Sequence, residues 1–193
     1  MLSSLNDLEL SSNNLIGVIP AFLGNLSKLT TLYLDENQFS SPISQELGML
    51  SSLSDLALSS NNLTGVIPAF LGNLSKLNTL YLYENQLSGL IPKKLGMLRS
   101  LSDLELSSNN LIGPIPTFIG NLSNLTNLYL DKNQQSGLIP QELGKLSFLS
   151  DLQLSSYYLI DGIPPFLGNL SNLTILHLDE NQFLGPIPQE LGC

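Results

Sequence analysis

Two side chains that often do chemistry in proteins, histidine and cysteine, occur once each in this chain, as His177 and Cys193. A serine or cysteine nucleophile needs a histidine base oriented by a third group, and a structural zinc needs four cysteine or histidine ligands. A single imidazole and a single thiol supply neither set. The sequence therefore predicts no nucleophilic triad, no zinc site and no enzymatic activity, and the lone cysteine excludes an intramolecular disulfide.

Adjacent carboxylates are the next candidates, because paired acids serve glycosidases and calcium sites. Asp35-Glu36 and Asp179-Glu180 form such pairs. Neighbouring residues of a strand point to opposite sides, however, and the equivalent pairs elsewhere contain Tyr83 or Lys132. We therefore interpret these acids as a solvated acidic face, and we expect no metal and no cofactor.

Aromatic and imidazole rings recur at a constant spacing, at Tyr33, Tyr81, Tyr129 and His177. Such rings among carboxylates suit cationic or polar peptide ligands, through ring faces, hydroxyl groups and charge pairing. The alternative is a solvated face inherited from tandem duplication. The predicted ligand-binding residues are Tyr33, Asp35, Asp55, Tyr81, Tyr83, Asp103, Glu105, Tyr129, Asp131, His177 and Asp179.

These residues lie in a repeat of constant length that occurs eight times in succession after Met1. The rings at Tyr33, Tyr81, Tyr129 and His177 belong to every second repeat. One such unit cannot bury its own apolar face, but a stack of units can, so a period of this length predicts a single elongated solenoid. The predicted repeats span 2–25, 26–49, 50–73, 74–97, 98–121, 122–145, 146–169 and 170–193, with no capping domains.

The charge is concentrated in one part of the repeat. Counted from the first leucine of each repeat, positions 6 to 11 hold twelve of the sixteen acids and one of the seven bases, so this acidic strip carries −11, against a net charge of −9 for the whole chain. Phosphate binding needs a basic stripe. We therefore expect no nucleic-acid partner.

Within positions 6 to 10, leucine alternates with polar residues, which is typical of a half-buried strand. Leu8 and Leu10 should point inward in the first repeat, and equivalent strands should form one parallel sheet. Position 12 is asparagine in seven repeats, where an amide can satisfy the backbone of its own and the neighbouring turn. The asparagines are Asn13, Asn37, Asn61, Asn85, Asn109, Asn133 and Asn181.

After this turn, the segment G-x-I-P should be extended and should return an isoleucine to the core, as at Ile19, Ile67, Ile115 and Ile187. The following P-x-x-L-G reads as a short 3₁₀ turn ended by glycine. The predicted fold is an α/β solenoid, a curved superhelix with the parallel sheet on its concave face and the 3₁₀ turns on its convex side.

The whole chain spells L-x-x-L-x-x-L-x-L-x-x-N-x-L-x-G-x-I-P-x-x-L-G, which resembles the plant-specific class of extracellular leucine-rich repeats; residues 98–121 match it at nearly every position. The alternating motifs S-D-L-x-L-S-S-N-N-L and L-Y-L-D-E-N-Q are similar to sequences in the ectodomains of plant receptor-like kinases. The resemblance implies an extracellular or cell-surface location and recognition of a peptide, protein or wall-derived ligand on the concave face.

The chain departs from that family in several places. Paired-cysteine caps, a signal peptide, a membrane span and a kinase are missing, so it looks like an internal fragment, a truncated gene product or an excised segment, with any membrane contact made by segments outside it. Ser41 and Ser44 replace the expected Gly and Pro, Tyr157 replaces the turn asparagine, and Asp161 displaces the Gly by one. We expect the joint at Tyr157 and the two ends of the stack to be weak.

Asn-x-Ser/Thr sequons are compatible with a glycosylated extracellular protein and should lie mostly off the strand face. They occur at Asn25, Asn62, Asn73, Asn121, Asn124, Asn169 and Asn172.

The favoured interpretation is a module of a plant cell-surface receptor that binds a peptide or protein, with a co-receptor as a further partner. A secreted defence protein similar to the polygalacturonase-inhibiting proteins is the first alternative. Ice binding is the second, and alternating Tyr and Glu spoil the flat, regular array that it needs.

Overall fold

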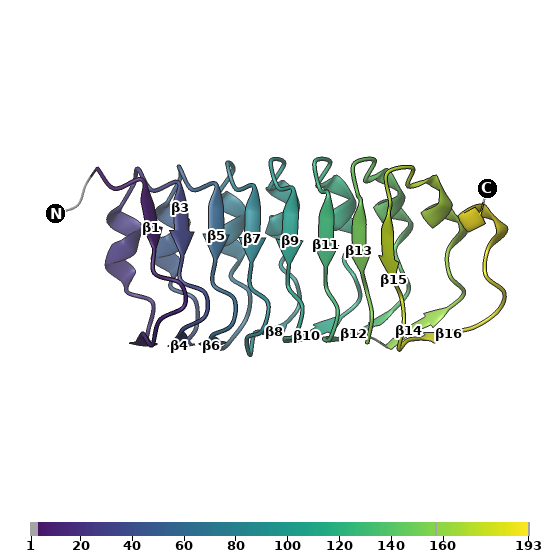
Figure 1. The fold of residues 1–193 in the computed structure, drawn as a ribbon, viewed down its shortest axis with the longest axis horizontal. Helices are drawn as coiled ribbons and strands as arrows, with labels where there is room; N and C mark the ends of the chain where they lie inside the picture. The colour runs from purple at the N-terminus through teal and green to yellow at the C-terminus, as the bar shows by residue number, and fades with distance from the viewer. Residues whose placement is uncertain (1–3, 157, 193) are drawn as a thin grey trace.

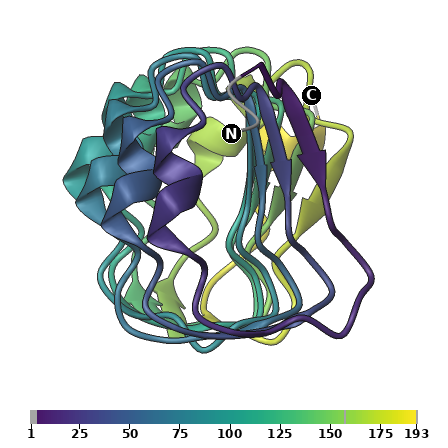
Figure 2. The same cartoon turned by 90° about the vertical axis from the view of Figure 1, so that its left-hand side faces the viewer.

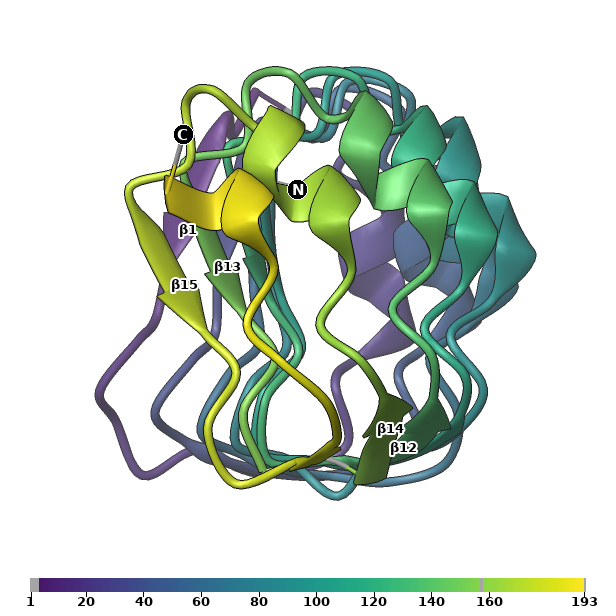
Figure 3. The same cartoon turned by 90° about the vertical axis from the view of Figure 1, so that its right-hand side faces the viewer.

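The computed structural model describes residues 4–156 and 158–192, and it shows a solenoid of stacked, similar turns of chain (Figure 1). Each turn contributes a strand to one long sheet, then a second short strand, then a 3₁₀ helix. Viewed from its two ends, the stack carries the long sheet on one side and the 3₁₀ helices on the opposite side (Figures 2 and 3). The predicted solenoid with a strand face and a 3₁₀ face is confirmed.

The long sheet has eight parallel strands in sequence order, each three residues long. Each strand pairs in register with the equivalent strand of the next repeat, for example Leu32 with Leu56 and Leu80 with Leu104. We call the outer surface of this sheet the strand face. Its strands are β1 (Asp7–Glu9), β3 (Thr31–Tyr33), β5 (Asp55–Ala57), β7 (Thr79–Tyr81), β9 (Asp103–Glu105), β11 (Asn127–Tyr129), β13 (Asp151–Gln153) and β15 (Ile175–His177).

In repeats 2 to 6 and 8, an asparagine side chain ties the turn after the strand to the preceding repeat. The Asn61 amide nitrogen donates to the carbonyl oxygens of Leu58, in its own turn, at 3.2 Å and of Leu34, in the repeat before, at 3.0 Å. Its oxygen accepts from the backbone nitrogen of Phe39 at 2.9 Å. The predicted structural role of the asparagines is therefore confirmed for the internal repeats. Tyr157, the one replacement, lies outside the described residues.

The residue at position 11 of each repeat, just before this turn position, adopts a left-handed backbone, with φ between 50° and 57°. These residues are Ser12, Glu36, Ser60, Glu84, Ser108, Lys132, Ser156 and Glu180. None is glycine, although this conformation costs an L-residue about 1–2 kcal/mol. In the seven repeats where asparagine follows, the hydrogen bonds of its side chain hold the turn in place.

The extended segment after the turn forms additional parallel sheets that sequence reasoning did not predict. One has five strands in the order β16-β14-β12-β10-β8, and the other has three in the order β2-β4-β6. An isolated bridge from Val66 to Ser88 lies between them. The strands are β2 (Ile16–Gly17), β4 (Gln38–Ser41), β6 (Asn62–Leu63), β8 (Ser88–Gly89), β10 (Asn110–Gly113), β12 (Gln134–Gly137), β14 (Tyr158–Asp161) and β16 (Gln182–Phe183).

Position 16 of the repeat requires a positive φ, between 73° and 99° in all eight copies. Six copies use glycine there. In the other two, Ser41 at 76° and Asp161 at 73° adopt the same conformation. In the seventh repeat, the glycine lies one residue later, at Gly162. The positive φ nevertheless remains at position 16, which is Asp161 in this repeat.

The 3₁₀ helices stack in two alternating ways. A Cβ on Gly24 or Gly72 would lie 2.3 Å from a carbonyl oxygen of the next repeat, so odd repeats place their helix directly against the backbone that follows. A Cβ on Gly48 would instead meet the ring of Phe70 at 2.9 Å. The helices are η1 (Ala21–Asn25), η2 (Gln45–Met49), η3 (Ala69–Asn73), η4 (Lys93–Met97), η5 (Thr117–Asn121), η6 (Gln141–Lys145), η7 (Pro165–Asn169) and η8 (Gln189–Gly192).

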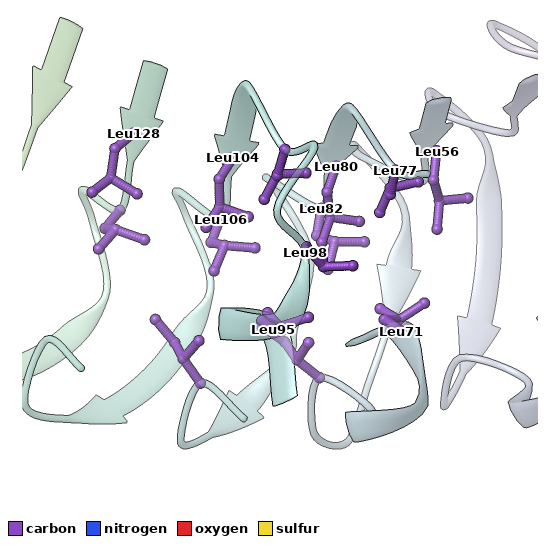
Figure 4. Packing of buried hydrophobic residues seen from close by; sticks show 14 of the residues in the cluster. Leu56, Leu71, Leu77, Leu80, Leu82, Leu95, Leu98, Leu104, Leu106 and Leu128 are labelled. Carbon is purple, nitrogen blue, oxygen red and sulfur yellow. The ribbon is translucent and has the colours of Figure 1, made fainter. Parts of the chain in front are cut away.

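The core is a continuous column of leucine and isoleucine side chains between the strand face and the 3₁₀ helices (Figure 4). Ile19, Ile67 and Ile115 return to it as predicted. Leu10 lies on the core side, where it lines an apolar cavity with Leu8 and Leu23, although its side chain is 38% exposed. The prediction for Ile187 is wrong, because its side chain is 75% exposed. Both residues lie in the terminal repeats of the described stack, where a stacking neighbour contacts one side only.

Candidate ligand-binding surface

The sheet register brings the most distinctive side chains of the strand face together at its middle. Tyr81, Glu105 and Tyr129 occupy equivalent positions on β7, β9 and β11, and they pair directly across the sheet. Side chains at directly paired positions of neighbouring strands are close enough to interact. A carboxylate therefore stands between two phenol rings. The central patch, as we use the term, comprises Tyr81, Tyr83, Asp103, Glu105, Tyr129, Asp131 and Asp151.

Glu105 is the electrostatic centre of this patch. Burial, together with the negative charges of Asp103, Asp131 and Asp151, raises the pKa of its carboxyl to about 7. An ordinary glutamate is fully ionised at neutral pH, whereas the raised pKa brings the titration of this carboxyl close to neutral pH. A cation placed over it would favour the charged form, so the site is able to couple cation binding to loss of a proton.

Asp151 orients the ring of Tyr129. The Tyr129 hydroxyl donates to the Asp151 carboxylate at 2.6 Å, and Asp151 is only 7% exposed. Burial and this bond to the carboxylate raise the pKa of the Tyr129 hydroxyl. Sequence reasoning placed Asp151 in the acidic strip but not among the binding residues. Asp151 occupies position 6 of its repeat, as Asp55 and Asp103 do in theirs, and this shared position could have identified it as a binding residue.

Of the acids at position 6, Asp55 and Asp103 are partly buried and held by hydrogen bonds, whereas Glu36, Asp179 and Glu180 of the adjacent acidic pairs are exposed, as the solvated-face interpretation expects. Asp55 accepts from the hydroxyl of Ser54 at 2.5 Å. Asp103 accepts from the Ser102 hydroxyl and from the side-chain amide of Asn127. These donors stabilise the carboxylates and fix their orientation.

The acids at position 10 form a second ordered row, because serine hydroxyls of odd repeats donate to acids of even repeats. Ser11 donates to Asp35, Ser107 to Asp131 and Ser155 to Asp179, each at 2.5 Å. For Asp179, this bond lowers the pKa of the carboxyl. The alternation of Ser-Ser with acidic pairs in the sequence is thus a hydrogen-bonded ladder whose unit is a pair of repeats.

Tyr83 interrupts this ladder. It replaces the acid that would accept from Ser59, and the buried Ser59 hydroxyl has no hydrogen-bond partner among the described residues. The Tyr83 ring instead lies 6.5 Å from the Tyr81 ring, centroid to centroid, at an interplanar angle of 55°. Burial and nearby carboxylates raise the pKa of Tyr81 to about 12 and that of Tyr83 above its usual value.

The remaining predicted binding residues lie away from this patch. Tyr33 pairs with Glu9 on one side and with Ala57 on the other, so Tyr33, Asp35 and Asp55 lie in the N-terminal part of the face and Ala57 separates Tyr33 from Tyr81. Burial, with the charge of Asp55 next, raises the pKa of Tyr33. His177 and Asp179 are exposed at the other end, where His177 pairs with Gln153. The predicted row is therefore divided into three parts.

The glycosylation candidates are all exposed, and none lies in a strand of the strand face. Asn25, Asn73, Asn121 and Asn169 end 3₁₀ helices on the opposite side. Among residues 4–156 and 158–192, no cluster of three or more His, Cys, Asp or Glu side chains could hold a metal ion. Within the same ranges, no helix is long and apolar enough to cross a membrane.

Comparison with protein-family models gives two matches. The model described as "Leucine rich repeat" matches residues 51–111. A second model, described as "Leucine Rich Repeat", matches 4–26, 28–50, 124–146 and 172–193. No curated protein matches the chain.

Solved structures give close matches. The ectodomain of the receptor kinase GASSHO1/SCHENGEN3 from Arabidopsis thaliana, in complex with CASPARIAN STRIP INTEGRITY FACTOR 2, is 41% identical with a TM-score of 0.97. The Arabidopsis receptor kinase HAESA, in complex with the peptide hormone IDA and the co-receptor SERK1, is 39% identical with a TM-score of 0.92. These matches cover 98% and 96% of this chain but only 23% and 31% of the two receptor chains.

A plant ice-binding protein is also similar, at 26% identity and a TM-score of 0.76, over 97% of this chain and 68% of the other.

Proposed function

The chain belongs to the leucine-rich-repeat family, and from this premise we propose that it is a recognition module that binds a peptide or protein through its central patch. The bound segment would carry a cationic side chain over Glu105, between the rings of Tyr81 and Tyr129. Ring faces and a carboxylate together attract a lysine or arginine side chain more strongly than either does alone. The module would recognise its ligand without catalysing a reaction.

The observation that carries this proposal is the departure from the repeat at Tyr83. An acid there would complete the serine–acid ladder, yet the chain places a ring beside Tyr81 and leaves the buried Ser59 hydroxyl without an acceptor among the described residues. Places where a local structural rule is broken without a local gain are expected at functional sites. Here the departure lies next to the carboxylate whose pKa is about 7.

The similar receptor structures support the class of ligand and the cellular setting. Both were solved as complexes, and HAESA was solved with a peptide hormone and a co-receptor. By analogy, the chain would be part of a plant receptor ectodomain at the cell surface, with a co-receptor as a further partner. The exposed sequons away from the strand face would allow glycans that leave the central patch open.

The proposal is tested with short synthetic peptides, each containing one lysine or arginine, and with matched peptides that carry acetyl-lysine or citrulline instead. We expect the charged peptides to bind and the neutral ones to bind much more weakly. Joint replacement Tyr81→Ala and Tyr129→Ala should weaken binding by about 2 kcal/mol or more, or about 30-fold. Binding should also tighten from pH 6 to pH 8, as Glu105 loses its proton.

The matched control is Lys93→Ala with Lys94→Ala on the 3₁₀ side, which should change the affinity little. Comparable losses from the two double variants in the same titration would contradict the assignment. Equal binding of the charged and neutral peptides would contradict a cationic ligand.

Ice binding is the second candidate, because the similar plant structure is an ice-binding protein. An assay of ice recrystallisation with the full chain separates the two. We expect no inhibition, because side chains of different size and charge alternate along the strand face. A polygalacturonase inhibitor remains an alternative protein-binding function, and a direct inhibition assay with a fungal polygalacturonase tests it.

A further inference from the structure

Three basic residues on the 3₁₀ side stand where the repeat pattern is broken. Positions 20 and 21 of the even repeats are Gln-Glu in repeats 2, 6 and 8, but Lys93-Lys94 in repeat 4. Position 2 is serine in seven repeats and arginine only in repeat 5, at Arg99. We call Lys93, Lys94 and Arg99 the basic cluster. Places where a repeat departs from its own pattern without a local gain are expected at functional sites.

The three departures meet at one junction in the interior of the stack. Lys93 and Lys94 begin η4, Arg99 follows that helix, and η5 of the next repeat packs beside it. All three side chains are exposed, and they line one cavity of about 390 Å³ on the side of the 3₁₀ helices (Figure 2). Both walls of this cavity belong to described repeats, because it lies between the fourth and the fifth.

The rest of the cavity is mostly apolar. Its other lining residues are Gly96, Met97, Phe118 and Asn121. The Phe118 ring lies 3.0 Å from the position that a Cβ on Gly96 would take, and the Met97 side chain is 61% exposed. A concave apolar surface with a few charged groups at its edge suits a ligand that carries both an apolar group and negative charge.

The chain does not neutralise the basic cluster itself. Within the part of the chain that the structure describes, neither Lys93 nor Lys94 forms an ion pair. Arg99 donates from one guanidinium nitrogen to the carbonyl oxygen of Asn121 at 3.1 Å. This bond holds the guanidinium at the cavity, and a guanidinium has five N–H donors, so others remain for a ligand.

We propose that the basic cluster is a second binding site, which takes an acidic peptide segment of a partner protein. An apolar side chain of that segment would enter the cavity against Phe118 and Met97. Carboxylates on either side of it would pair with the lysines and with Arg99, whose guanidinium can hold a carboxylate through two parallel hydrogen bonds. The site lies on the opposite side from the central patch, so the chain would bind two partners of opposite charge.

The surroundings favour a short segment over a larger anionic surface. A membrane or a nucleic acid would also contact the neighbouring junctions, where Glu46, Glu142 and Glu190 occupy the place of Lys94 and would repel it. A sugar chain buries many hydroxyl groups that need partners. Among the described residues that line the cavity, Asn121 is the one uncharged polar side chain.

An NMR titration of the isotope-labelled full chain with the peptide Gly-Glu-Glu-Leu-Glu-Glu-Gly tests the proposal. The chain is produced in bacteria, which attach no glycan to Asn121 at the edge of the cavity. We expect the amide signals of η4 and η5 to move and those of the strand face to stay. A peptide with Gly in place of Leu should bind about tenfold more weakly. A peptide with Gln in place of every Glu should not bind.

Replacing the basic cluster by the residues of the equivalent junctions gives the first variant. Lys93→Gln, Lys94→Glu and Arg99→Ser together should keep the melting temperature of the parent, because repeats 2 and 3 already carry these residues. Affinity for the acidic peptide should fall about tenfold or more. Lys28→Glu with Lys145→Glu lowers the net charge equally at exposed positions elsewhere, so this control should bind as the parent does.

The junction between repeats 2 and 3 provides the reciprocal variant, because it has the same residues at the equivalent apolar and amide positions. They are Gly48, Met49, Phe70 and Asn73. Gln45→Lys, Glu46→Lys and Ser51→Arg together should create a second site there. The acidic peptide should then also move the amide signals of η2 and η3, which do not respond in the parent.

Several outcomes would overturn the proposal. They are equal binding by the parent and the first variant, an equal loss in the control, and no response of η2 and η3 in the reciprocal variant. Binding of an oligogalacturonide without binding of the acidic peptide would show a sugar acid as the ligand. Salt-sensitive self-association of the parent that the peptide does not reduce would show that the basic cluster takes the acidic strip of a second copy.

Discussion

Glu105 shows how neighbours in the sheet change the chemistry of one residue. Its carboxyl is an ordinary acid in the sequence, but burial and three nearby aspartates raise its pKa to about 7. A folded-state pKa above the unfolded value near 4.5 means that the folded state binds more protons between these pH values. The free energy of unfolding should therefore fall as the pH rises from about 4.5 to 7.

The substitution Glu105→Gln should remove this dependence. At pH 8 the variant should be more stable than the parent by about 1–2 kcal/mol, a value reduced for solvent screening of a half-exposed group. At pH 4 the two should be equally stable, because the glutamate is then protonated. Urea unfolding of dilute protein at both pH values measures the difference. Glu9→Gln, at the same position of the exposed first strand, is the control, and an equal gain there would refute the interpretation.

The serine–acid ladder gives a second prediction at the level of residues. Ser107 donates to Asp131 at 2.5 Å, whereas Ser59 has no acceptor among the described residues. Ser107→Ala should lower the free energy of unfolding by about 1 kcal/mol, and Ser59→Ala should leave it unchanged or raise it. The pair is matched in residue type and position in the repeat. Equal losses in chemical denaturation would show that the ladder contributes nothing.

At the level of elements, each repeat needs a residue with a positive φ at position 16, within the extended segment that follows the turn. Ser41 has a φ of 76° there, whereas most repeats have glycine. Ser41→Gly should raise the free energy of unfolding by about 0.5–1 kcal/mol, because relief of the left-handed strain exceeds the entropy cost of a glycine. Asp161→Gly should act in the same direction.

Ser40→Gly is the control for this prediction, since Ser40 precedes Ser41 in β4 and has no positive φ. It should be destabilising by about 0.5–1 kcal/mol. Thermal unfolding of the two variants should therefore move in opposite directions. A loss of stability in both would mean that the serine side chain at position 41 makes a compensating contact.

At the level of the whole molecule, the charges are separated between two sides. The acidic strip borders the strand face, while six of the seven bases lie outside it and Lys132 alone lies within it. Charges on one face steer an oppositely charged partner, and salt screens them beyond about 8–10 Å at physiological ionic strength.

Lys132→Glu should therefore raise the association rate of a cationic peptide at low salt, and the gain should vanish at high salt. Lys145→Glu changes the net charge equally but lies in η6 on the opposite side, so it should have a smaller effect. Stopped-flow or surface binding kinetics at two salt concentrations give the comparison. Identical rate gains from both variants would show that net charge, rather than its placement, controls association.

The sequence alone determined the solenoid, the strand in each repeat, the asparagine turn and the 3₁₀ turn. These follow from a strict repeat period that fixes which side chains are apolar, which residue breaks a helix and which amide follows each strand. Leu56 and Ile67 have counterparts in all the other internal repeats, and Asn61 in all of them except the seventh, where Tyr157 stands, so local pattern was sufficient.

Only the tertiary structure decided the additional sheets, the two alternating ways in which the 3₁₀ helices stack, and the chemistry of the central patch. Residues in other repeats determine the pKa of Glu105 and the bond from Tyr129 to Asp151. They also leave the Ser59 hydroxyl without an acceptor among the residues that the structure describes. A terminal leucine reads like an internal one in the sequence, yet Leu10 and Ile187 are exposed. A side chain of this stack is buried only where the neighbouring repeat covers it. The stacking of the repeats determines how closely neighbours approach, and the sequence of one repeat does not show it.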